Sequence, residues 1–70
     1  MFINTIRKIK EKKYIKKLKA INEKPFCFQY EFFKELQTEA KADYMKKKIS
    51  PTFYLNYFIV DDFREMIKTL

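Results

Sequence analysis

The chain has 70 residues, of which 16 are Lys or Arg and nine are Asp or Glu, so its formal net charge is +7. A chain of this length forms at most one domain, and its core is small enough that a partner or a second copy is a common source of further stability. A single Cys excludes an intramolecular disulfide, and the absence of His excludes metal sites built from His and Cys within one chain. Lys outnumbers Arg 14 to 2 and Gly is absent, which is the kind of bias that AT-rich coding produces.

Positive charge is concentrated in the first third of the chain. Residues 1–24 contain nine basic and two acidic side chains, whereas residues 25–70 contain seven of each. The stretch IRKIKEKKYIKKLK predicts a basic helix over about residues 4–21. Its apolar residues change direction, because Ile6 and Ile9 share one side while Tyr14 and Leu18 are rotated away from them. Either the helix is kinked near residues 11–13, or its two halves pack against different surfaces.

Two prolines mark the later helices. Pro25 in NEKP and Pro51 in SP both suit the first position of a helix, where the missing N–H is not needed, and Ser50 is placed to cap the third helix. We therefore expect the second helix over about residues 25–48 and the third over about residues 51–70. The apolar stripe of the second consists of Phe26, Tyr30, Phe33, Leu36, Ala40 and Tyr44, and that of the third of Leu55, Ile59, Val60, Phe63, Met66, Ile67 and Leu70.

The predicted fold class is all-α. We expect one small three-helix domain, in which a basic N-terminal helix in residues 1–24 joins a charge-neutral, aromatic-rich helical pair in residues 25–70. An α+β domain is the alternative, because FCFQYEF at 26–32 alternates and TFYLNYFIV at 52–60 is rich in β-prone residues. In that alternative Asp62 and Glu65 have the spacing of a capping box for a last short helix. The helical stripes continue through both segments, which favours the all-α fold.

The composition also argues against catalysis. Without His there is no usual general base, and without Gly there is no phosphate-binding loop or dinucleotide fingerprint. Cys27 near the start of the second helix is either a thiol activated by the helix dipole or a small apolar residue at the core edge. Asp61, Asp62 and Glu65 either hold a divalent cation or form a solvated face. We favour the structural role for both, and expect a non-enzymatic protein with no catalytic residue, no metal site, no cofactor and no small-molecule substrate.

Basic side chains on the first helix form the candidate polyanion-binding site. Flexible lysines neutralise phosphates as point charges without reading bases, which predicts salt-dependent binding of nucleic acid with little sequence specificity. The alternative is a lysine-rich helix that is only solvated. The predicted polyanion-binding residues are Arg7, Lys8, Lys10, Lys12, Lys13, Lys16, Lys17 and Lys19.

Aromatic residues outside the stripes give a second candidate surface. If they remain exposed, they form a patch typical of an interface with another protein or with a second copy of the chain. Stacking on unpaired bases near the lysines is the alternative, although the RNP and GXXG patterns of common RNA-binding modules are missing. The candidate protein-interface residues are Phe28, Phe32, Tyr54, Tyr57 and Phe58.

These features lead to one expected function and two alternatives. We expect the basic helix to contact nucleic acid or a nucleoprotein assembly, while the aromatic face of the second and third helices contacts protein. The first alternative is a small inhibitor or accessory protein, of the type that phages and mobile elements encode, bound to a protein target. The second is an amphipathic first helix lying on an anionic membrane surface.

The sequence also suggests a location. No apolar run approaches the ~20 residues needed to span a bilayer, and the basic N-terminus is not followed by the apolar block of a signal peptide. The expected location is therefore intracellular and cytoplasmic. The mitochondrial matrix is an alternative, because the first 21 residues are basic and nearly free of acids.

Overall fold

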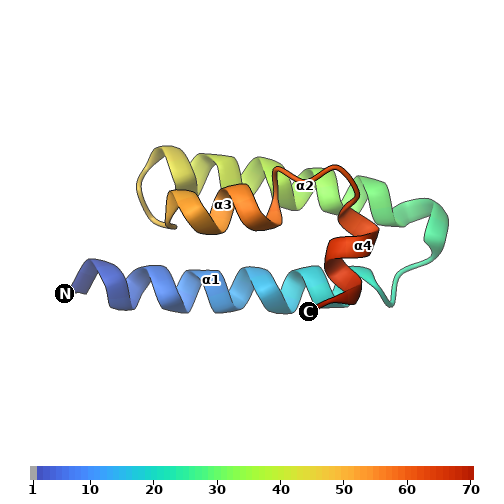
Figure 1. The fold of residues 1–70 in the computed structure, drawn as a ribbon, viewed down its shortest axis with the longest axis horizontal. Helices are drawn as coiled ribbons and strands as arrows, with labels where there is room; N and C mark the ends of the chain where they lie inside the picture. Colours follow the sequence, from blue (N-terminus) through green and yellow to red (C-terminus); the bar gives the residue numbers. More distant parts are fainter. Residues whose placement is uncertain (1) are drawn as a thin grey trace.

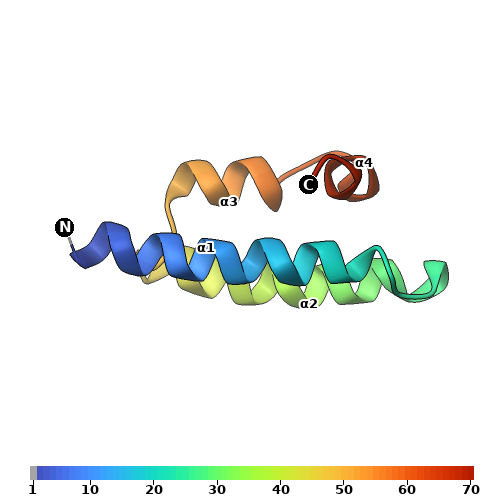
Figure 2. The ribbon, with the colours of Figure 1, turned by 90° about the horizontal axis from the view of Figure 1, so that it is seen from below.

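The computed structural model describes residues 2–70, with side chains from residue 5 onward. These residues form four helices, α1 (Phe2–Ile21), α2 (Phe26–Met45), α3 (Pro51–Tyr57) and α4 (Phe63–Lys68), and no strand. The all-α prediction is confirmed, and the α+β alternative is wrong. Figure 1 shows α1 and α2 as an antiparallel pair, with α3 returning beside α2 and α4 lying across the direction of the other helices. Figure 2 shows that α3 and α4 cover one face of the α1–α2 pair.

The first helix is continuous. It passes through residues 11–13 without a break and is nearly straight in both views (Figures 1 and 2). The predicted kink near these residues is therefore wrong. Tyr14, Leu18 and Ile21 are buried, whereas Ile6 and Ile9 are about half exposed. The change in direction of the apolar stripe therefore reflects two environments along one helix: its second half packs into the core, and its first half is largely solvated.

The prolines take different places at the two helix starts. Pro25, predicted as the first residue of the second helix, is instead the N-cap of α2, and the helix begins one residue later at Phe26. Pro51 is the first residue of α3, as predicted. Ser50 caps that helix, because its Oγ accepts a hydrogen bond from the backbone N–H of Phe53 at 3.1 Å. A proline suits either place, since neither position uses a backbone N–H in the helix.

The second helix ends at Met45, three residues before the predicted end, in a left-handed turn. Lys47 has a φ of 61° and is the only non-glycine residue with positive φ in the part of the chain that the structure describes. The Lys47 N–H donates to the Tyr44 carbonyl at 3.0 Å, and the Lys48 N–H donates to the Asp43 carbonyl at 2.8 Å. These bonds make a Schellman motif, in which Gly is the usual left-handed residue. In a chain without Gly, a lysine takes that position.

The predicted third helix, 51–70, is wrong as one helix. It is divided at residues 58–62 into α3 and α4. Phe58 is fully buried just after α3, and the Gln37 side-chain amide donates to its carbonyl at 2.6 Å. Asp62 then caps α4, because its side chain accepts hydrogen bonds from the backbone N–H groups of Arg64 and Glu65. The break turns Phe58 and Phe63 into the same core, whereas Ile59 of the expected stripe stays exposed.

The core is largely aromatic and lies where the four helices meet. Phe33 of α2 stacks on Phe63 with 4.6 Å between ring centroids, and Tyr44 stacks on Tyr54 at 4.7 Å. Aromatic pairs of this kind add about 0.5–1.5 kcal/mol beyond the area they bury. The buried core residues are Tyr14, Leu18, Ile21, Phe33, Leu36, Ala40, Ile49, Phe53, Tyr54, Phe58, Phe63 and Ile67.

Candidate nucleic-acid interface

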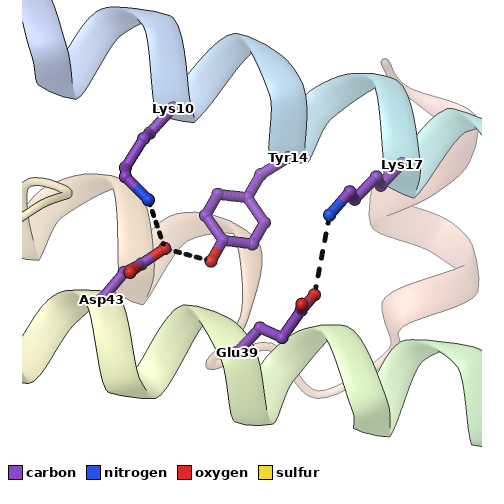
Figure 3. A network of polar contacts seen from close by, with 5 residues as sticks. All are labelled: Lys10, Tyr14, Lys17, Glu39 and Asp43. Carbon is purple, nitrogen blue, oxygen red and sulfur yellow. Dashed lines mark hydrogen bonds and ion pairs between the residues drawn. The ribbon is translucent and has the colours of Figure 1, made fainter.

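The polar contacts between α1 and α2 fix which side of the basic helix faces solvent. The Tyr14 hydroxyl donates a hydrogen bond to the Asp43 carboxylate, and the Lys10 ammonium lies 3.4 Å from the same Asp43 oxygen (Figure 3). One turn further along, the Lys17 ammonium lies 3.7 Å from a Glu39 oxygen. In Figure 3 these five side chains point toward one another across the two helices. The contacts hold α1 in one rotation about its axis.

Burial and charge shift the pKa values of the central pair. Burial raises the pKa of Tyr14 above its ordinary value, and the hydrogen bond to Asp43 and the charges of Asp43 and Glu39 raise it further. Burial also acts to raise the pKa of Asp43, but the hydrogen bond from Tyr14 and the nearby ammonium groups outweigh it, so this pKa lies below its ordinary value. Both shifts favour the pairing of a neutral tyrosine with an ionised carboxylate at neutral pH.

A second set of contacts anchors the N-terminal half of α1. The Arg7 Nε–H donates to the Lys47 carbonyl at 3.2 Å. The Ser50 backbone N–H donates to a Glu11 carboxylate oxygen at 3.0 Å. These bonds tie α1 to the turn between α2 and α3. The helix is therefore held along most of its length before any ligand binds.

The structure divides the eight predicted polyanion-binding residues into two groups. Arg7, Lys10 and Lys17 are engaged by groups of the protein itself. The other five are exposed, and in the described part of the chain no carboxylate forms an ion pair with any of them. These five are Lys8, Lys12, Lys13, Lys16 and Lys19.

Four of the exposed lysines lie on one face of α1, and we call them the lysine row: Lys8, Lys12, Lys16 and Lys19. Their spacing of four, four and three residues places neighbouring members on the same side of a helix. At a rise of 1.5 Å per residue, the row is about 16 Å long. The face lies away from the buried Tyr14 and Leu18, so the row is turned to solvent.

A further group of cations was missed by sequence reasoning. Residues 25–70 are neutral overall, which concealed the run of three lysines at 46–48. Because α1 and α2 are antiparallel, the end of α2 lies beside the beginning of α1 (Figure 1). A groove of about 380 Å³ is lined by Ile6, Arg7, Lys10, Lys47 and Lys48. The signal that could have found it is the lysine run itself, once the antiparallel pairing is assumed.

The predicted aromatic face is only partly present. Phe28 and Phe32 on α2 remain exposed, at 49 % and 39 %. Tyr54 and Phe58 are buried, and Tyr57 is half-buried against Phe53, so the expectation that these three join an exposed aromatic face is corrected. The reason is the break after α3, which turns Phe58 inward. A groove of about 330 Å³ beside the two exposed rings is lined by Lys24, Pro25, Phe28, Glu31, Phe32 and Glu35.

Other candidate chemistry is dispersed. Cys27 is exposed and is not in a disulfide. Within residues 2–70, no three Cys, Asp or Glu side chains come together in a way that could hold a metal ion. Asp62, one of the three acids considered for a cation, serves as the N-cap of α4. None of the helices described has both the length and the apolar character needed to cross a bilayer.

The fold and this surface define a small all-α protein with a row of exposed lysines along one helix. The chain matches no protein-family model, no curated protein and no solved structure.

Proposed function

We propose that this protein is a non-enzymatic binding protein whose α1 contacts nucleic acid, or a nucleoprotein assembly, with little sequence specificity. The observation that carries the proposal is the lysine row, Lys8, Lys12, Lys16 and Lys19, exposed without a carboxylate partner in the part of the chain described. Ammonium groups in this arrangement neutralise successive phosphates and release their counterions, which favours association without base readout.

The pairing of the other lysines supports this assignment. Lys10 and Lys17 face α2 and meet Asp43 and Glu39, so those acids are directed toward the helix pair rather than toward the row. A lysine-rich composition caused by AT-rich coding does not by itself explain why the acids of α2 face one side of α1 while the unpaired lysines lie on the other side. The separation concentrates positive potential on the solvent side of the helix.

A binding assay with charge-matched variants tests the proposal. The row variant carries Gln at all four positions of the lysine row, because Gln keeps the helix propensity and removes the charge. The matched control replaces four exposed lysines elsewhere by Gln, so both variants lose the same net charge. The control positions are Lys24, Lys34, Lys41 and Lys68.

The two variants are compared by fluorescence anisotropy on random-sequence DNA and RNA at low salt. We expect the row variant to lose at least roughly tenfold in affinity, since several phosphate contacts disappear, and the control to lose much less. Equal losses for row and control variants would mean that only net charge matters, and the proposed interface would be wrong. Circular dichroism of each variant checks that the helices are retained.

A second candidate function, contact with a protein, is favoured by the exposed Phe28 and Phe32. Their rings border a groove that also contains Glu31 and Glu35, and the Lys24 ammonium lies 5.0 Å from the Phe32 ring centroid. Exposed aromatic rings with a polar rim are typical of protein interfaces. This arrangement fits an accessory or inhibitor protein that holds a protein target at α2.

Sedimentation velocity over a range of protein concentrations tests the self-association form of this candidate. Phe28→Ser together with Phe32→Ser should abolish any dimer, while Leu55→Ser, at a similarly exposed apolar residue on α3, should leave it intact. A dimer that survives the double variant would place the contact elsewhere.

A further inference from the structure

Two grooves meet where the beginning of α1 lies against the turn after α2. The first, of about 380 Å³, is lined by four basic residues, Arg7, Lys10, Lys47 and Lys48, and by Ile6, so that its wall consists largely of side-chain stems that carry charged ends. The second, of about 560 Å³, is mainly apolar and is lined by Arg7, Tyr44, Met45, Lys47, Ile49 and Pro51. Arg7 and Lys47 line both, so the two grooves adjoin at these residues, and we call them together the junction groove.

Arg7 is positioned to receive an anion at this junction. Its Nε–H is used by the Lys47 carbonyl, at 3.2 Å, which holds the guanidinium in place at the border of the two grooves. No contact inside the protein is made by its terminal amino groups, in the part of the chain that the structure describes. A guanidinium held in this way can donate two parallel hydrogen bonds to a phosphate.

The acids that face the junction are already engaged. Asp43 is bound by Tyr14 and Lys10, and Glu11 accepts a hydrogen bond from the Ser50 backbone. Lys47 and Lys48 are exposed, and neither forms an ion pair within residues 2–70, although the charge of Lys48 helps to lower the pKa of Asp43. The junction therefore keeps a positive excess that a phosphate can neutralise.

The backbone at Lys47 adds an independent observation. A lysine in the left-handed region carries a conformational cost of roughly 1 kcal/mol that a glycine would not. Unfavourable backbone conformations concentrate at binding sites, where a side chain is needed in a place that the fold would otherwise give to Gly. Here the strained residue lies at the border of the two grooves and presents both a carbonyl to Arg7 and an ammonium to the junction.

The apolar half of the junction groove offers a surface for a planar group. Tyr44 lines it, and its ring is held by stacking on Tyr54 with 5° between the planes. Met45, at the same wall, is 71 % exposed. An exposed thioether and a half-buried aromatic ring beside cations match a nucleotide, which carries a flat base next to a phosphate.

We infer that the junction groove binds one nucleotide of an unpaired strand, with the phosphate at Arg7 and Lys47 and the base against Tyr44 and Met45. This inference rests on the proposed function and specifies the strand form that the protein prefers. A duplex keeps its bases stacked inside the helix, so it can occupy the lysine row but cannot place a base in the apolar half.

The test follows backbone amide resonances of the ¹⁵N-labelled protein. The probes are an oligothymidylate of about ten nucleotides, the same strand annealed to its complement, inorganic phosphate, and phosphatidylglycerol vesicles. We expect the single strand to shift the resonances of residues 7 and 44–49 together with those of the lysine row. Inorganic phosphate should shift residues 7 and 47 weakly. The duplex should shift the row, with no more than the same weak shifts at residues 7 and 47, and should leave residues 44–46 and 49 unshifted.

Two variants separate this inference from the proposed function. Met45→Ser and Arg7→Lys should each weaken single-strand binding by roughly fivefold or more while leaving duplex binding within about twofold, because they remove a base contact or the planar fork but not the row. Met45 is exposed, so its replacement does not threaten the core.

Each other outcome has one meaning. Shifts confined to the row with both nucleic acids overturn the junction groove and leave the proposed function standing. No binding of either nucleic acid overturns both. If vesicles shift the resonances of residues 44–49 and the single strand does not, the groove binds a lipid phosphate and the inference of a nucleotide site is wrong.

Discussion

Replacing Lys47 with Gly tests the left-handed turn that ends α2. The residue has a φ of 61°, and the motif it completes is held by two backbone hydrogen bonds, one from Lys47 and one from Lys48. A glycine keeps both bonds and removes the contact between Cβ and the backbone. A Lys47→Ala variant is the matched control, because it removes the same charge and keeps Cβ.

The expected gain follows from two opposing effects. Relief of the left-handed conformation is worth about 1–2 kcal/mol. The greater freedom of glycine in the unfolded chain costs about 0.5–1 kcal/mol. The difference is a stabilisation of about 0–1.5 kcal/mol, and its central value of about 0.75 kcal/mol raises Tm by about 3–6 °C for a domain of this size.

Thermal and urea denaturation followed by circular dichroism measure the effect. We expect the free energy of unfolding to rank Lys47→Gly above the unmodified protein, and Lys47→Ala at or below it. A Gly variant no more stable than the Ala variant would show that residue 47 is not left-handed in solution. The conformation of Lys47 would then no longer support the inference of a binding site at the junction groove.

Three further results are expected from the contacts described. Acidification should lower the free energy of unfolding below about pH 4, because the lowered pKa of Asp43 means that folding favours its ionised form. In urea denaturation at a series of pH values, Asp43→Asn should reduce this loss of stability in acid, and an unchanged loss would contradict the assignment. Alkali should lower the free energy of unfolding above about pH 10, because the raised pKa of Tyr14 means that folding favours its neutral form. This loss of stability in alkali should be smaller in Tyr14→Phe. Asp62→Ala removes the cap of α4 and should cost about 1 kcal/mol, measured by urea denaturation, with Asp61→Ala as a control that stays within about 0.5 kcal/mol.

The helical class could be predicted because the signals for it are local. Prolines and a capping serine mark where helices begin. Phe33, Leu36 and Ala40 of the predicted stripe in the second helix are buried as their spacing indicates, whereas Phe26 and Tyr30 of the same stripe are exposed. The break after α3 could not be predicted from stripes alone, because apolar residues occur on every face of residues 51–63. A continuous helix buries Leu55 and Ile59, whereas the actual fold exposes them.

The division of the candidate site depends on tertiary contacts that a single helix does not reveal. Lys10 and Lys17 look equivalent to their neighbours in the sequence, yet they face α2 and its acids. The lysines at 46–48 lie far from α1 in sequence and next to it in space. Sequence reasoning therefore predicted the basic helix but not which of its cations stay free, nor the groove at its N-terminal half.

The salt dependence of binding to random-sequence duplex DNA tests the central claim most directly. If the four ammonium groups of the lysine row each neutralise a phosphate, removing them should make the slope of log affinity against log salt concentration shallower by about 3 to 4. The control variant, with four other lysines replaced, should keep a slope close to that of the unmodified protein. Equal slopes for the row variant and the unmodified protein would contradict the account, because the row would then not meet the phosphates.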